Sequence, residues 1–214
     1  MSKPLILISN DDGITSKGIR VLVETMKRLG DVVVVAPDGP QSGMGHAITI
    51  GNTLRLEENE IFGDVSAYEC SGTPADCVKI AKHFVLKDRQ PHLVVSGINH
   101  GANTSISVLY SGTMSAAIEA ALEGTPAIGF SLCDYSHEAD FDHAVEYVDR
   151  IAKTVLEKGM TKGVALNVNI PPRRNESIKG IKICRQANAK WQEDFDQRHD
   201  PFGRRYFWMA GIFF

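Results

Sequence analysis

The chain has 214 residues, of which 43% are hydrophobic and 23% are charged, and its formal net charge is −3. This composition is typical of a globular protein with an apolar core, and the charge gives no electrostatic reason to expect a nucleic-acid polymer or a membrane as a partner. The four cysteines form no CxxC pair, which favours unreactive thiols in a reducing cytoplasm. The apolar run near the N-terminus is too short for a signal peptide, and no stretch is long enough to span a bilayer.

Predicted strands and helices alternate along most of the chain. Short apolar runs rich in β-branched residues predict buried strands at residues 5–9, 32–36, 93–96, 127–131 and 164–170. Between the strands, apolar residues at helical spacing predict three helices, marked by Ile19, Leu22, Val23, Met26 and Leu29, by Ile118, Ala121 and Leu122, and by Val145, Val148, Ile151, Ala152, Val155 and Leu156. This alternation predicts a doubly wound α/β fold with a mainly parallel sheet.

Two regions depart from the alternation. Residues 47–68 contain short apolar runs at 48–50, 54–56 and 65–68, which predict a small antiparallel excursion. From Asn188 the chain is polar and aromatic around an Asp-Pro-Phe-Gly turn, which predicts a projecting hairpin. We therefore expect an α/β domain at residues 1–187 and a hairpin appendage at residues 188–214.

The polar loops that follow the predicted strands are the candidate site, because ligands of an open parallel sheet bind beyond the carboxyl ends of its strands. Asp11 and Asp12 follow the first strand, and two adjacent carboxylates repel each other unless a cation is present. Mg²⁺ or Mn²⁺ prefers oxygen ligands, and Ser42 and Asn99 in the other loops could add neutral oxygens. From these residues alone, the preferred interpretation is that Asn-Asp-Asp-Gly is only a turn and helix cap.

A second candidate element is Ser111-Gly112-Thr113, which opens an alanine-rich helix. Free N–H groups and the helix dipole favour an anion at such a position, but Ser and Thr also cap helices that bind nothing, so both interpretations stay open. For the similar segment at 71–76 the capping interpretation is preferred. His46 and His100 are candidates for substrate contact or for protonation of a leaving oxygen, and plain loop residues are an equal alternative.

Five segments together resemble the SurE family of survival proteins, which are metal-dependent 5′-nucleotidases. They are Ser-Asn-Asp-Asp-Gly-Ile at 9–14, Ala-Pro-Asp-Gly-Pro-Gln-Ser-Gly-Met-Gly-His at 36–46, Ser-Gly-Thr-Pro-Ala-Asp-Cys-Val at 71–78, Val-Ser-Gly-Ile-Asn-His-Gly-Ala-Asn at 95–103 and Tyr-Ser-Gly-Thr-Met-Ser-Ala-Ala at 110–117. Their order and spacing cover nearly the whole chain. The resemblance implies a Rossmann-like core and the hydrolysis of nucleoside 5′-monophosphates, with looser activity on 3′-nucleotides and short polyphosphate.

The resemblance also implies roles for particular residues. One divalent ion per subunit, Mg²⁺ or Mn²⁺, is held by Asp11, Asp12, Ser42 and Asn99. Catalysis is assigned to Asp11, Asp12 and Asn99, and phosphate binding to Asn99, Ser111, Gly112 and Thr113. Family members form homodimers or homotetramers, and residues 191–211 resemble the hairpin used in that assembly. They usually continue past the Trp-Met-x-Gly stretch at 208–211, so we expect a weaker assembly from a chain that ends at Phe214.

Two other functions remain possible from the residues. Asp11 or Asp12 could act as a nucleophile through an aspartyl-phosphate, although such phosphatases usually show Asp-x-Asp after the first strand. The chain could also be a non-catalytic, metal-dependent nucleotide-binding module. Dinucleotide oxidoreduction is disfavoured because no G-x-G-x-x-G follows the first strand.

Overall fold

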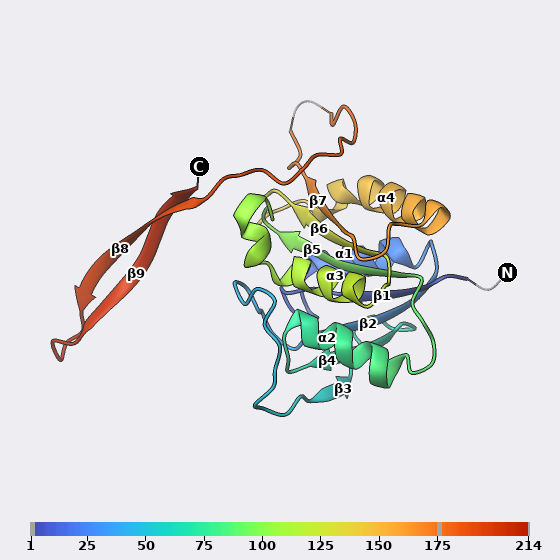
Figure 1. The fold of residues 1–214 in the computed structure, drawn as a ribbon, viewed down its shortest axis with the longest axis horizontal. Coiled ribbons are helices and arrows are strands. Elements are labelled where there is room, and N and C mark those ends of the chain that lie inside the picture. The colour runs from blue at the N-terminus through green and yellow to red at the C-terminus, as the bar shows by residue number, and fades with distance from the viewer. Residues whose placement is uncertain (1–2, 175–176, 214) are drawn as a thin grey trace. The chain divides into compact units, whose positions relative to one another are not determined.

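The structure is a computed structural model that describes residues 3–174 and 177–213. It divides into two compact units (Figure 1). The first, called the α/β unit, comprises Met1–Asn103 and Ser107–Gly180, and the second, called the hairpin unit, comprises Thr104–Ile106 and Ile181–Phe214. Within the described ranges, no helix has the length and apolar character needed to cross a membrane.

A seven-stranded sheet forms the centre of the α/β unit. In spatial order its strands are β3 (Leu56–Glu58), β4 (Ser66–Cys70), β2 (Asp31–Pro37), β1 (Leu5–Ser9), β5 (Leu93–His100), β6 (Ala127–Leu132) and β7 (Ala165–Ile170). All neighbouring strands are parallel except β3 and β4. The chain builds outward from β1 to one edge and then crosses to β5 on the other side of β1. This arrangement confirms the predicted doubly wound fold and places its switch point between β1 and β5.

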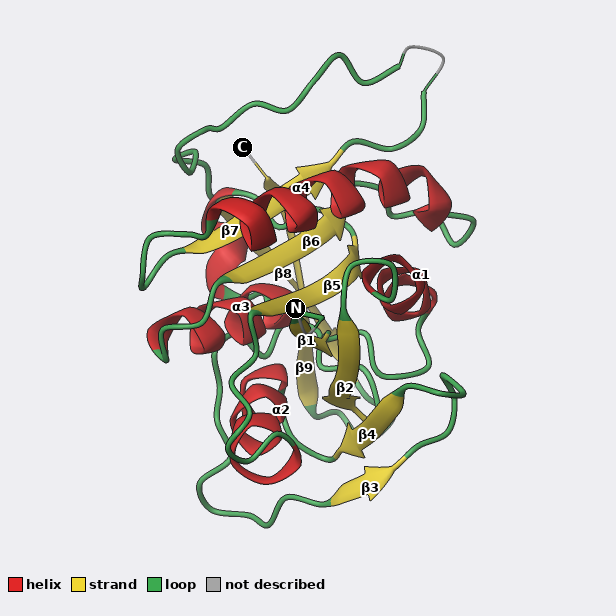
Figure 2. Cartoon of the chain, turned by 90° about the vertical axis from the view of Figure 1, so that its right-hand side faces the viewer, coloured by secondary structure: helices red, strands yellow, loops and turns green. Residues whose placement is uncertain are grey.

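Helices cover both faces of the sheet (Figure 2). One face carries α1 (Lys17–Met26) and α4 (Val145–Lys158), and the other carries α2 (Pro74–Ile80) and α3 (Gly112–Leu122). Short helical turns η1 (Ala81–Val85), η2 (Ser105–Leu109) and η3 (Phe141–Ala144) complete the helical elements. All five residues of β1 are buried, Ile6 and Ile8 toward α1 and α4, Leu5 and Leu7 toward α2 and α3. A strand covered on both faces needs a continuous apolar sequence, and β1 has one.

Three details differ from the predictions. Residues 48–50 form no strand, because the N–H and hydroxyl of Thr49 donate to the carboxylate of Asp76 and hold the segment at the start of α2. The short strand expected at 65–68 is β4, which joins the seven-stranded sheet parallel to β2. Within that sheet, β3 and β4 are the antiparallel pair. Leu122 is 71% exposed, while small alanines form the buried side of α3.

The hairpin unit contains two antiparallel strands, β8 (Trp191–His199) and β9 (Arg205–Phe213). The carboxylate of Asp200 in the connecting turn accepts the N–H groups of Phe202 and Arg204, as turn-forming aspartates commonly do. The predicted C-terminal hairpin is therefore confirmed.

Candidate active site

Asp11 and Asp12, the carboxylate pair, lie at the carboxyl end of β1 beside the switch point. Asp11 is only 5% exposed, and Asp12 is partly buried. The hydroxyl of Thr113 donates to Oδ1 of Asp11 at 2.5 Å, and the N–H of His100 donates to Oδ2 of Asp12 at 3.2 Å. The pair is thus held between the first turn of α3 and the end of β5, two elements about a hundred residues away in the chain.

The start of α3 lies directly against Asp11. A Cβ atom at Gly112 would be 2.5 Å from Cβ of Asp11, so only glycine permits this approach. The Ser111 hydroxyl accepts the N–H of Met114 at 3.0 Å and caps the helix. The Thr113 hydroxyl therefore donates its proton inside the protein, whereas the Ser111 hydroxyl accepts there and keeps its own proton. That proton and the first-turn N–H groups are what the start of α3 offers to an anion.

Burial raises the pKa of Asp11 to about 6, and the negative charge of Asp12 adds to this effect while the Thr113 hydroxyl opposes it. Burial also raises the pKa of Asp12, against the hydrogen bond and charge of His100. The charges that act on the pair are thus that of Asp12 on Asp11 and that of His100 on Asp12. Adjacent carboxylates of this kind, one buried and one partly buried, are stabilised as anions by a cation.

Asn99 comes from the carboxyl end of β5, on the other side of the switch point. One proton of its Nδ2 is donated to the carbonyl oxygen of Gly101 at 2.7 Å, which fixes the orientation of the amide, and its Oδ1 is the atom that can serve a cation. The loop that starts at Asn99 therefore presents an oxygen on the same edge as the carboxylate pair.

An amide cluster holds the far end of this loop. Asn103 donates from its N–H to Oδ1 of Asn169 and from Nδ2 to Oγ of Ser131, while its carbonyl accepts Nδ2 of Asn167 and of Asn169. The four residues of this cluster were not predicted from the sequence. The Asn-Val-Asn alternation in β7 is the signal that could have done so, because it places two amides on one face at the end of a strand.

Ser42 is exposed in the loop that follows β2. The N–H of Gln41 donates to the carbonyl oxygen of Asp11 at 2.7 Å, and that of Gly45 donates to the carbonyl oxygen of Tyr110 at 3.1 Å. The loop is thus attached next to the carboxylate pair and again beside the start of α3, with Ser42 between the two attachments.

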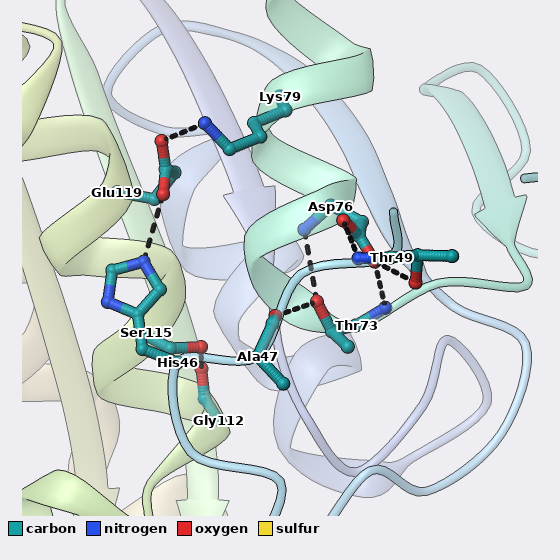
Figure 3. A network of polar contacts seen from close by, with 9 residues as sticks. All are labelled: His46, Ala47, Thr49, Thr73, Asp76, Lys79, Gly112, Ser115 and Glu119. Atoms are coloured by element: carbon teal, nitrogen blue, oxygen red, sulfur yellow. Dashed lines mark hydrogen bonds and ion pairs between the residues drawn. The ribbon is translucent and has the colours of Figure 1, made fainter. Parts of the chain in front are cut away.

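Figure 3 shows how the continuation of this loop is fixed to α2 and α3. Nε2 of His46 lies 2.9 Å from Glu119, whose other oxygen pairs with Lys79 at 2.6 Å. Farther on, the Thr73 hydroxyl donates to the carbonyl oxygen of Ala47. His100 is also engaged, with Nε2 2.7 Å from the carbonyl oxygen of Ser136. Both candidate histidines therefore have structural contacts.

Polar groups also lie beneath the pair. Ser9 and Ser96 are adjacent across β1 and β5 and face α2 and α3 by strand alternation. Their hydroxyls and Oδ1 of Asn10 are buried and have no hydrogen-bond partner among the residues described. The described residues contain no cluster of three or more His, Cys, Asp or Glu placed to share a metal ion. The oxygen-rich setting, with two carboxylates and neutral oxygens, fits a hard cation better than a soft one.

Fold and site together define a doubly wound α/β protein with an acidic, oxygen-lined site at its switch point. The family model for survival protein SurE matches residues 6–193. A protein of Cytophaga hutchinsonii called 5′-nucleotidase SurE is 72% identical over 213 residues, covering 100% of this chain and 82% of the relative. The protein of the same name from Flavobacterium psychrophilum is 58% identical, covering 100% and 83%. The chain belongs to the SurE family.

A solved structure shows the same relationship. The crystal structure of the SurE protein from Aquifex aeolicus matches with a TM-score of 0.83 and 41% sequence identity, covering 97% of this chain and 82% of that one. The similarity therefore extends beyond the loop motifs to the fold as a whole.

Proposed function

We propose that this chain is a divalent-metal-dependent phosphomonoesterase that hydrolyses nucleoside 5′-monophosphates to nucleoside and phosphate. The observation that carries the proposal is the carboxylate pair, placed against the first turn of α3 at the switch point. A cation site next to an anion-binding helix start is the arrangement that a phosphate ester requires. The names of the curated relatives support the same activity.

Asp11, Asp12, Ser42 and Asn99 would hold one divalent ion, Mg²⁺ or Mn²⁺, per subunit. The raised pKa values of the two carboxylates and the free Oδ1 of Asn99 support this assignment. When bound, such an ion supplies Lewis acidity toward phosphate oxygens and lowers the pKa of a bound water. The chain's own contribution is to fix the carboxylates in place, chiefly through Thr113 and the N–H of His100.

Phosphate binding is assigned to Asn99 and to the segment Ser111-Gly112-Thr113. Within that segment the phosphate contacts are assigned to the first-turn N–H groups and to the Ser111 hydroxyl, which accepts the N–H of Met114 and keeps its own proton to donate, whereas the proton of the Thr113 hydroxyl is donated to Asp11. Gly112 lets the start of α3 lie directly against Asp11, which brings the N–H groups of the first turn next to the carboxylate pair. Helix N–H groups that are already oriented stabilise charge that develops on the equatorial oxygens.

The test is phosphate release from a panel of nucleotides, with Mg²⁺ or Mn²⁺ and with a chelator. Nucleoside 5′-monophosphates should be the best substrates, followed by 3′-nucleotides and short polyphosphate. Release that is undiminished by the chelator would contradict the metal assignment. Nucleotide binding without any release would favour the non-catalytic module instead.

The proposal includes self-association, as a homodimer or homotetramer, through the appendage at residues 188–214. In the register of the hairpin, Phe195, Phe207 and Met209 share one face, and they are 59%, 55% and 71% exposed. Exposed apolar surface of this kind usually marks an interface. Phe207→Ser should lower the mass measured by sedimentation velocity, whereas Trp208→Ser on the opposite face should have less effect. Unchanged association in both variants would contradict this interface.

The four cysteines are free, which fits a cytoplasmic location where thiols stay reduced. We expect nucleotides and further copies of this chain as partners, and neither a nucleic-acid polymer nor a membrane.

A further inference from the structure

Tyr135 is an exposed aromatic residue with a fixed position beside the candidate site. It lies in the loop that follows β6, and 73% of the residue is exposed. Its hydroxyl oxygen nevertheless accepts the N–H of Ala102 at 3.1 Å. An exposed tyrosine that is tied to the backbone of a second loop presents its ring in a defined orientation, so less conformational entropy is lost when a ligand covers it.

The ring lies against Gly101, in the loop that starts at Asn99. A Cβ atom at Gly101 would be 2.4 Å from Cε1 of Tyr135, and the φ angle of +107° also favours glycine. The carbonyl oxygen of this same Gly101 accepts Nδ2 of Asn99. The tyrosine ring is therefore packed on the residue that orients Asn99.

A second contact joins the two loops. Nε2 of His100 lies 2.7 Å from the carbonyl oxygen of Ser136, and the N–H of Ser136 donates to Oδ1 of Asp134 at 2.9 Å. Tyr135 thus stands between two residues that are themselves fixed. The ring is held against the loop that starts at Asn99, while most of the residue stays open to solvent.

We propose that Tyr135 is the nucleobase platform of this site, on which the purine or pyrimidine of a mononucleotide stacks. The inference rests on the proposed function, because it extends a phosphate bound near Asn99 through its ribose to the base. Aromatic rings accept any base, since every base has a π-face. The platform therefore selects nucleotides over other phosphate esters without strong preference among the bases.

The test compares a nucleoside 5′-monophosphate with ribose 5-phosphate, which has the same phosphate and sugar but no base. Tyr135→Ala should raise KM for the nucleotide roughly 5- to 100-fold, the range expected for one lost base–aromatic stack. KM for ribose 5-phosphate should stay near the wild-type value. Tyr135→Phe keeps the ring but loses the hydrogen bond to Ala102 that orients it, so KM for the nucleotide should rise by less than in Tyr135→Ala.

Two further variants serve as controls. Phe84→Ala is the matched control, because Phe84 is also an exposed aromatic residue, 69% exposed, and lies in η1 on another part of the α/β unit. This variant should change KM neither for the nucleotide nor for ribose 5-phosphate. Tyr110, 52% exposed and next to Ser111, is the rival platform. A nucleotide-specific loss in Tyr110→Ala but not in Tyr135→Ala would overturn the proposal.

Binding of adenosine, which carries a base and no phosphate, gives a readout that does not depend on turnover. Isothermal titration calorimetry should show weaker adenosine binding in Tyr135→Ala than in wild type. If wild type hydrolyses no ester but binds adenosine through Tyr135, the platform stands and the proposed activity is wrong. If Tyr135→Ala raises KM equally for both esters, or leaves adenosine binding unchanged, Tyr135 only supports the Asn99 loop and the platform is wrong.

Discussion

Asp11 and Asp76 are both buried aspartates near the start of a helix, and they are only 5% and 2% exposed. Asp76 accepts hydrogen bonds from the N–H and hydroxyl of Thr49 and from the N–H of Thr73. Burial opposes its charge, but these donors outweigh burial and lower its pKa. Asp11 accepts the Thr113 hydroxyl and has Asp12 beside it, and its pKa rises to about 6.

The comparison separates two uses of a buried carboxylate. At Asp76 the chain supplies the donors that an anion needs, and the result is a stable junction between α2 and the segment around Thr49. At Asp11 the chain supplies less stabilisation and adds a second carboxylate. Groups left in such an unfavourable state are characteristic of functional sites, and here the missing stabilisation is what a cation would provide.

The largest expected effect comes from removing charge at the site. Asp12→Asn takes one negative charge from a hard-cation ligand set, so phosphate release should fall by about 100-fold or more, equivalent to several kcal/mol of transition-state stabilisation. Initial rates at saturating Mn²⁺ and a Mn²⁺ titration would measure both effects. Unchanged turnover together with unchanged Mn²⁺ affinity would remove Asp12 from the site.

Asp11 should make metal-free stability depend on pH. Its pKa is about 6 in the folded chain, against an ordinary value of 3.8, so the folded state keeps a proton that the unfolded state has already lost. The resulting stability is fully present below the lower value and disappears as pH rises through the higher one. The free energy of unfolding should therefore fall by up to about 3 kcal/mol across this range.

Asp11→Asn should remove this pH dependence of the free energy of unfolding, so comparing the variant with wild type tests the role of Asp11 directly. Urea denaturation with a chelator should show the variant becoming the more stable protein as pH rises past 6, because the buried charge is gone. Saturating Mn²⁺ should close or reverse this difference by stabilising the wild-type carboxylate. A difference between the two proteins that does not change with pH would mean that burial does not control Asp11.

Thr113→Val tests how Asp11 is held in place. The hydroxyl donates to Asp11, so we expect Mn²⁺ affinity to fall by roughly tenfold, as for other residues that orient a metal ligand. Thr25→Val is the matched control, since Thr25 is another buried threonine whose hydroxyl donates to a carbonyl within α1. Weaker substrate binding in Thr113→Val, with Mn²⁺ affinity unchanged, would instead mean that the hydroxyl contacts phosphate.

The sequence was sufficient to predict most of the fold because strands buried on both faces, such as β1, carry a distinctive apolar sequence. It was misleading at residues 48–50, where an apolar-polar-apolar pattern resembles a strand but Thr49 bonds to Asp76 instead. Leu122 was placed on the apolar side of the helix by its spacing, yet it is 71% exposed and neighbouring alanines form the buried side. Both errors arise because tertiary contacts override local preference.

The candidate site shows the same limit at the level of side chains. Spacing and loop position sufficed to nominate Asp11 and Asp12, because strand ends meet at one edge of a parallel sheet. The partner of each hydroxyl was not predictable, since Thr113 reaches Asp11 across 102 positions of the chain. The bond between Tyr135 and Ala102 likewise joins two loops that have no local relation. The roles of Thr113 and Tyr135 depend on contacts of this kind, so they follow from the three-dimensional structure and not from the sequence.

The last expected effect, which concerns stability and not turnover, comes from the same substitution at the other aspartate. Asp76→Asn places an amide group where carboxylate oxygens accept donors from Thr49 and Thr73, so a donor faces a donor. The free energy of unfolding at neutral pH should fall by about 1–3 kcal/mol, opposite in sign to the metal-free effect of Asp11→Asn.

The effect of Asp76 on stability should also depend on pH. Because the pKa of Asp76 is lowered in the folded chain, its carboxylate stabilises the fold at pH values above its ordinary pKa, and this stabilisation is lost as pH falls through the folded-state pKa. The deficit of Asp76→Asn should therefore shrink on acidification, whereas the advantage of Asp11→Asn grows as pH rises. Urea denaturation of both variants across the same pH series checks the contrast, and a stabilising Asp76→Asn would end the distinction between the two carboxylates.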